Sequence, residues 1–76
     1  MSKGREHHQT HQGEIIFGRS TLACEISNLS ASGARVNVAG ANELPQEFDL
    51  SITLTQTKHY CAVVKRKASY VRVVFV

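Results

Sequence analysis

The segment Glu47–Thr55, EFDLSITLT, alternates polar and apolar side chains at every step. This period of two is typical of a β-strand that buries one face and exposes the other. The segment Thr21–Ser27, TLACEIS, repeats the pattern. Both segments therefore predict strands of a sheet with a hydrophobic core on one side. The expected buried faces comprise Leu22, Cys24, Ile26, Phe48, Leu50, Ile52 and Leu54.

Four further segments complete a set of about six expected strands. They are Glu14–Phe17, Ala34–Val38, Tyr60–Lys65 and Tyr70–Val76. Glycine, proline, asparagine and serine residues mark the connections between the strands. Short strands with close turns and no crossover helix predict an all-β fold, a six-stranded antiparallel barrel, because closure removes the exposed edges of a sheet.

Residues 1–12 differ in composition from the rest of the chain, since almost all of them are polar. We expect residues 1–12 to be a flexible polar tail. Residues 13–76 are expected to form one domain, and a chain of this size buries only about 60% of its unfolded surface. His7 and His11 would share a face if the tail were helical, which keeps a surface metal site as an alternative to solvated side chains.

The composition of 42% apolar and 20% charged residues is typical of a folded, soluble protein. No apolar run approaches the roughly 20 residues that cross a bilayer, and no apolar signal segment follows Met1. We therefore expect a cytoplasmic protein without membrane insertion. Cys24 and Cys61 fit that compartment as reduced, buried residues. The net charge of +3 suits an anionic ligand.

The segment Asn28–Ala34, NLSASGA, lies between two expected strands. Its asparagine and serine side chains are suited to bonding nearby backbone amides, and Gly33 is able to adopt a positive φ where a β-carbon would clash. Taken alone, the segment favours a structural turn.

From Gly13 to Phe75 the chain resembles the PilZ family of bacterial proteins, which bind the second messenger cyclic di-GMP. The resemblance rests on Asn28, Ser30 and Gly33, and on the flanking sequences LACEIS, GARV, LPQEFDL, CAVVKR and VVF. It implies a six-stranded barrel whose turn contacts a guanine of the ligand. It therefore implies a binding module rather than a catalyst.

The second motif of that family, two arginines separated by three residues before the first strand, is degenerate in this chain. Arg5 is the only arginine of the tail, and His7 or His8 stands near the other expected position. An imidazole is shorter than a guanidinium and mostly uncharged at neutral pH. The loss of one or two charge-assisted contacts, at roughly 1.5 to 3 kcal/mol each, weakens binding by about one to four orders of magnitude.

Other cations lie elsewhere in the sequence. Lys65, Arg66 and Lys67 precede the last hairpin, where they form either a solvated turn or, as a basic side chain in that region often does in similar proteins, part of the lining of the ligand groove. Arg66 is the preferred phosphate partner because its guanidinium can bind two oxygens, and Arg35 is a weaker candidate. Arg72 stands where the family carries a glycine, so it either blocks the pocket or replaces a missing charge. The predicted ligand-binding residues are Arg5, Asn28, Ser30, Gly33 and Arg66.

The expected function is a cyclic di-GMP receptor or adaptor in bacterial signalling, whose tail folds over the ligand and presents a new surface to an effector protein. One alternative is a degenerate PilZ domain that does not bind the ligand and acts through protein–protein contacts. Another is a small basic barrel that binds single-stranded nucleic acid, which requires aromatic stacking platforms. We expect neither a cofactor nor an enzyme, because His59 is the only histidine in the predicted domain and has no evident carboxylate to orient it.

Overall fold

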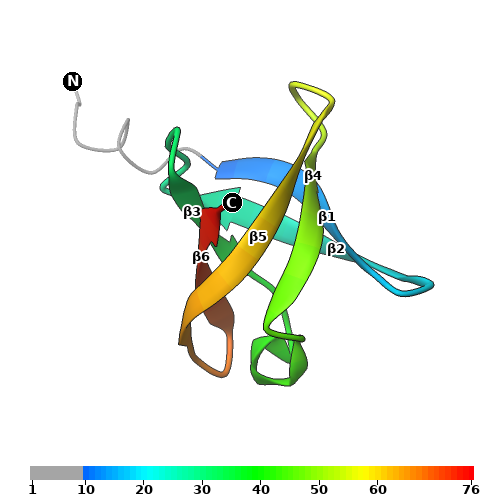
Figure 1. Ribbon diagram of the computed structural model, residues 1–76, viewed down its shortest axis with the longest axis vertical. Coiled ribbons are helices and arrows are strands. Elements are labelled where there is room, and N and C mark those ends of the chain that lie inside the picture. The colour runs from blue at the N-terminus through cyan, green and yellow to red at the C-terminus, as the bar shows by residue number, and fades with distance from the viewer. Residues whose placement is uncertain (1–9) are drawn as a thin grey trace.

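Six antiparallel strands close into a barrel in the computed structural model, which describes residues 10–76 (Figure 1). The predicted fold class is confirmed. The strands follow one another around the barrel in the order β1-β2-β3-β6-β5-β4. Their bounds, with those of one short 3₁₀ helix, are β1 Thr10–Phe17, β2 Ser20–Ser27, β3 Gly33–Asn37, η2 Ala41–Glu43, β4 Glu47–Ile52, β5 Thr57–Arg66 and β6 Tyr70–Phe75.

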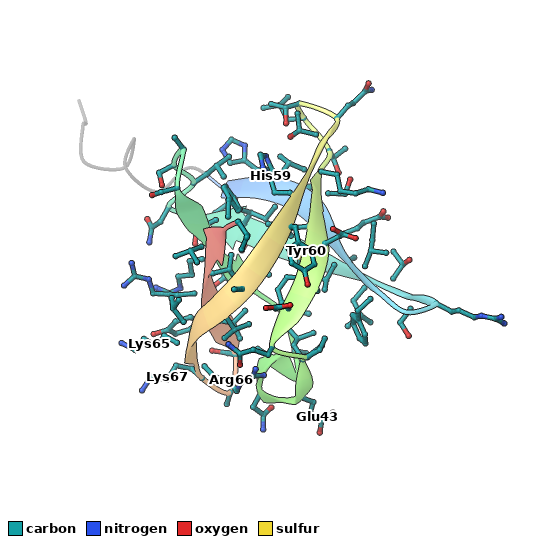
Figure 2. The ribbon with its side chains drawn as sticks, viewed as in Figure 1. Glu43, His59, Tyr60, Lys65, Arg66 and Lys67 are labelled. Atoms are coloured by element: carbon teal, nitrogen blue, oxygen red, sulfur yellow. The ribbon has the colours of Figure 1, made fainter. Side chains whose placement is uncertain are left out.

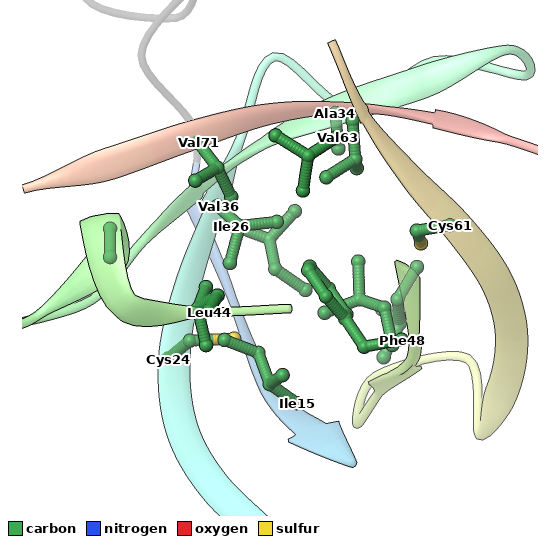
Figure 3. Packing of buried hydrophobic residues seen from close by; sticks show 14 residues of the cluster. Ile15, Cys24, Ile26, Ala34, Val36, Leu44, Phe48, Cys61, Val63 and Val71 are labelled. Atoms are coloured by element: carbon green, nitrogen blue, oxygen red, sulfur yellow. The ribbon is translucent and has the colours of Figure 1, made fainter. Parts of the chain in front are cut away.

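The alternation of the strands fills the barrel with one hydrophobic cluster (Figure 3). Among the residues described, no polar or charged side chain is buried. Cys24 and Cys61 are buried and unpaired, as predicted. Burial, with a smaller effect of Glu14, raises the pKa of Cys24 to about 11. Burial also raises the pKa of Cys61 to about 12, helped by the charge of Asp49.

Two of the residues expected in the core lie at the surface instead. Leu54 is 74% exposed because β4 ends at Ile52 and Leu54 falls in the following turn. Leu22 is 39% exposed because β3 pairs only with residues 25–27 of β2. The outer part of β2 therefore pairs with β1 alone, and this hairpin extends beyond the barrel (Figure 1). The period of two predicts the face of a residue but not where its neighbouring strand ends.

Strand β1 begins at Thr10, so residues 10–12 of the predicted tail pair with residues 25–27 of β2. Arg5, His7 and His8 lie outside the described residues. The described part of the chain contains no helix with the length and apolar character needed to cross a membrane.

A β-bulge in β5 sets which cations face outward. Val63 lies opposite Val73 of β6, while Lys65 lies opposite Arg72, so Val64 is an extra residue in the ladder. Strict alternation from the buried Val63 would turn the side chain of Lys65 inward. With the bulge, Val64 and Lys65 are both exposed. The side chain that follows Lys65 in β5 therefore faces the side opposite to the one that strict alternation would give.

Arg66 is the residue most affected by this reversal. It lies opposite the buried Val71 and is half-buried itself. Its Nη1 donates hydrogen bonds to the carbonyl oxygens of Leu44 at 2.5 Å and Asn42 at 3.4 Å. Figure 2 shows Arg66 directed toward η2, whereas Lys65 is directed away from the strand. Arg66 therefore ties β5 to the segment that contains η2.

Candidate functional site

The turn that follows β2 opens onto a shallow hollow in the surface of the barrel. The hollow also reaches over β3, β6 and the bulge of β5, and has a volume of about 110 Å³. Enclosed small-molecule pockets are usually about 300 to 1,000 Å³, so this hollow is a surface depression rather than an enclosed pocket. The lining residues are Asn28, Ser30, Ser32, Gly33, Ala34, Arg35, Val64, Arg72, Val73 and Val74.

Ser30 organises the turn through its hydroxyl group. The Oγ accepts hydrogen bonds from the backbone N–H groups of Ser32 and Gly33, both at 3.3 Å, and donates one to the carbonyl oxygen of Gly33 at 3.2 Å. The backbone N–H of Ser30 donates to the same oxygen at 2.9 Å. These bonds make Ser30 a positioning residue of the turn, in agreement with its predicted structural role.

Asn28, not Gly33, has the positive φ in this turn. The φ of Asn28 is 53°, in the left-handed region that asparagine tolerates better than most residues. Gly33 is required for a different reason from the one expected. A β-carbon at this position would collide with the carbonyl oxygen of Val73 and come within 3.2 Å of the Cα of Val74. The glycine thus permits a close approach of β3 to β6, which brings the turn up to the hollow.

Three cations lie side by side on the outer face of β3, β6 and β5. Arg35 is the ladder partner of Arg72, and Arg72 is in turn the partner of Lys65. Cross-strand partners have their side chains on the same face of the sheet. We call Arg35, Arg72 and Lys65 the basic row. Its first two members line the hollow, and the third extends the row beyond it.

Arg35 is held in place by its neighbours. Its guanidinium carbon lies 3.9 Å from the centre of the Tyr70 ring, and its Nε donates to the Oδ1 of Asn37 at 3.2 Å. The amide of Asn37 donates in turn to the Glu25 carbonyl oxygen and to the Ser27 Oγ, both at 3.1 Å. This chain of contacts holds the guanidinium group of Arg35 in one orientation on the outer face of the sheet.

The structure brings together three of the five predicted site residues. Asn28, Ser30 and Gly33 line the same hollow. Arg66 is not among its lining residues, because the bulge directs it to the carbonyl groups near η2. Arg5 lies outside the described residues.

The exposed apolar surface of Val64 and Val74 was not anticipated from the sequence. Val64 is 61% exposed and Val74 is 40% exposed. The sequence signal was the continuous apolar run YCAVV over residues 60–64, which lacks the alternation of the other strands. That signal is weak, because continuous apolar runs also occur in regular strands that are buried on both faces.

Other candidate chemistry is not assembled in the described part of the chain. Residues 10–76 contain no group of three or more histidine, cysteine or acidic side chains that could hold a metal ion. The His59 ring stacks on Phe75 with a centroid distance of 4.3 Å. Tyr60 donates a hydrogen bond to the Oε1 of Glu47 at 2.5 Å, and this bond raises the pKa of the phenol.

Comparisons of the chain with models of protein families, with curated proteins and with solved structures gave no significant match. The chain is therefore identified by its fold alone, as a small, closed, six-stranded antiparallel β-barrel.

Proposed function

We propose that the chain is a PilZ-type receptor that binds cyclic di-GMP across the hollow beside the turn after β2. One observation carries this proposal. The turn residues Asn28, Ser30 and Gly33 line the same hollow as two arginines that come from β3 and β6. The resemblance to the PilZ family implies that the turn contacts a guanine and that a pair of guanidinium groups binds the phosphates, and the hollow offers side chains of both kinds.

The side chains at the hollow match the chemistry of this ligand. The exposed amide of Asn28 offers both donors and an acceptor to the edge of a guanine. Arg35 and Arg72 can each form paired hydrogen bonds to phosphate oxygens or to the O6 and N7 atoms of guanine. Val64 and Val74 offer exposed apolar surface against which the face of a base can pack.

The nucleic-acid alternative has less support from the aromatic residues. Phe48 is buried in the core, and Phe17 and Phe75 are packed against it. One face of Tyr70 is occupied by Arg35, and Tyr60 is bonded to Glu47. A sequence-tolerant single-strand site uses aromatic rings that are free to stack on successive bases.

A degenerate adaptor is the second candidate, and the single arginine of residues 1–12 favours it. Such an adaptor would keep the barrel and contact an effector protein without binding the nucleotide. An enzymatic role has no support from the thiols, because burial raises the pKa of Cys24 and Cys61 and so keeps them as weakly nucleophilic neutral groups.

Isothermal titration of the full chain with cyclic di-GMP near 0.15 M salt tests the receptor function, since screening at that salt suppresses non-specific attraction of phosphate. We expect saturable binding at low micromolar concentration, and no comparable binding of GTP. The variant Asn28→Gly removes the amide while tolerating the φ of 53°, and it should weaken binding at least tenfold.

Asn42→Ala serves as a matched control because Asn42 is an exposed asparagine of η2 that does not line the hollow. Its affinity should equal that of the unmodified chain. An absence of heat at high concentrations of cyclic di-GMP would reject the receptor function in favour of the degenerate adaptor.

A further inference from the structure

We infer that the basic row Arg35–Arg72–Lys65 supplies the phosphate-binding charge of this site from the barrel itself, so that binding does not depend on Arg5. The inference rests on the proposed function and deepens it. It assigns the phosphates of a cyclic dinucleotide to residues of β3, β6 and β5 rather than to the segment that precedes β1.

The spacing of the row fits a ligand with two phosphates. Arg35, Arg72 and Lys65 occupy consecutive strands in register. Neighbouring strands are about 4.8 Å apart, so the row spans about 10 Å of the surface. Two phosphates of one ligand can therefore each meet a different cation, which a single inorganic phosphate cannot do.

The charges of the row are expected to destabilise the barrel when no ligand is bound. Like charges on directly opposed residues of a ladder repel each other, and here two such pairs follow in succession. An anion bound between them would remove the repulsion. The stacking of Arg35 on Tyr70 holds one member of the row in position without neutralising it.

The surface beside the bulge adds a second feature at the same place. The bulge turns Lys65 outward beside the exposed Val64, and Val74 is exposed opposite Gly33, which has no side chain. Bulges are frequent next to functional sites because they redirect a side chain and end regular pairing. The surface next to the row is therefore apolar and open, which suits the flat face of a purine. Together these features indicate a purine dinucleotide rather than a free phosphate.

Binding of cyclic di-GMP by variants of the full chain tests this assignment. Arg72→Gln should raise the Kd at least tenfold, as expected for the loss of one charge-assisted contact. Arg72→Lys should recover part of that loss, because it restores the charge without the planar fork. Lys65→Gln should weaken binding by a smaller factor of about five. Arg5→Gln should leave the Kd within twofold of the unmodified chain.

Lys67→Gln and Lys58→Gln are matched controls, because both lysines are exposed and neither belongs to the row. Each should bind within twofold of the unmodified chain. Thermal unfolding of Arg72→Gln should be unchanged or improved, since Arg72 is exposed and its removal relieves repulsion.

The outcomes separate this inference from the proposed function. Strong binding that is lost in Arg5→Gln but kept in Arg72→Gln overturns the inference and leaves the receptor function standing. Equal affinity for inorganic phosphate or GTP shows a non-selective basic surface and overturns the dinucleotide assignment. If the unmodified chain does not bind cyclic di-GMP, the proposed function fails and the inference fails with it.

Discussion

The missing side chain of Gly33 leaves room for the carbonyl oxygen of Val73, which would collide with a β-carbon at that position. This contact lies where the turn after β2 enters β3, and Gly33 is the ladder partner of Val74 on β6. The backbone N–H of Phe75 also donates to the carbonyl oxygen of Ser32 at 2.8 Å. The turn is thus fastened to β6 at two neighbouring points, and its geometry depends on the absence of one methyl group.

Gly33→Ala is expected to destabilise the barrel by about 1 to 3 kcal/mol, because the backbone must shift to relieve the collision. Urea unfolding would measure the loss. Gly40→Asn is the matched control, since Gly40 has open space around it and a left-handed conformation that asparagine tolerates. Equal stabilities of the two variants would contradict the role given to the Gly33 contact.

Ser30→Ala is expected to cost about 1 kcal/mol or more of stability, since three hydrogen bonds of its hydroxyl to the turn backbone are lost. Ser32→Ala removes only an exposed contact between two hydroxyl groups, so its stability should change by less than about 0.5 kcal/mol. Chemical denaturation of both variants gives the comparison. If Ser32→Ala is the more damaging change, the assignment of Ser30 as the organiser of the turn is wrong.

Arg66→Gln is expected to reduce stability by about 1 to 2 kcal/mol without changing ligand affinity. Its guanidinium bonds the carbonyl oxygens of Leu44 and Asn42, and a lost bond to a charged donor has a cost of this order. Unfolding experiments and ligand titration on the same variant separate the two effects. A loss of affinity with unchanged stability would restore the sequence-based prediction that Arg66 binds phosphate.

The stability of the barrel is expected to fall as the pH rises above about 9. The ordinary pKa of a thiol is 9.0, whereas burial raises the pKa of Cys24 to about 11 and that of Cys61 to about 12. Between these values the folded state binds more protons than the unfolded state, so the free energy of unfolding decreases with pH. Between its two pKa values, each thiol lowers the free energy of unfolding by up to about 1.4 kcal/mol per pH unit. Below about pH 9 the stabilisation from both thiols is fully present.

Urea unfolding between pH 8 and pH 10.5 measures this slope. Cys61→Ala should show a shallower decline than the unmodified chain, because one of the two thiols is gone. The difference in slope is the diagnostic quantity, since other groups that titrate in this range are common to both proteins. Parallel declines would show that the buried thiols are not the cause.

The sequence predicted the barrel well because alternation directly encodes which face of a strand is buried. Ile26, Leu50 and Ile52, all assigned to the core in this way, are at most 2% exposed. Leu22 and Leu54 share the same alternation but lie beyond the reach of a neighbouring strand or after the end of their own. Burial there depends on strand ends, which are set by pairing between distant segments rather than by local periodicity.

The candidate site was predicted in part for a similar reason. The turn residues Asn28, Ser30 and Gly33 are close in sequence, so their grouping follows from local structure alone. Lys65 faces outward while Arg66 is directed toward η2, and this difference follows instead from the register between β5 and β6. A register shift of one residue leaves no mark on composition or charge, so the sequence could not show which of these two cations joins the basic row.

The bulge at Val64 also affects how this surface would respond to the insertion or deletion of a residue. Val63 and Lys65 lie opposite Val73 and Arg72, which are themselves adjacent residues, so the ladder on either side of Val64 is the one that a strand without it would form. Gain or loss of that single codon would therefore alter the hollow while leaving the rest of the barrel in register. We therefore expect this patch to accept the gain or loss of one residue without the compensating changes in the core that a substitution there would demand.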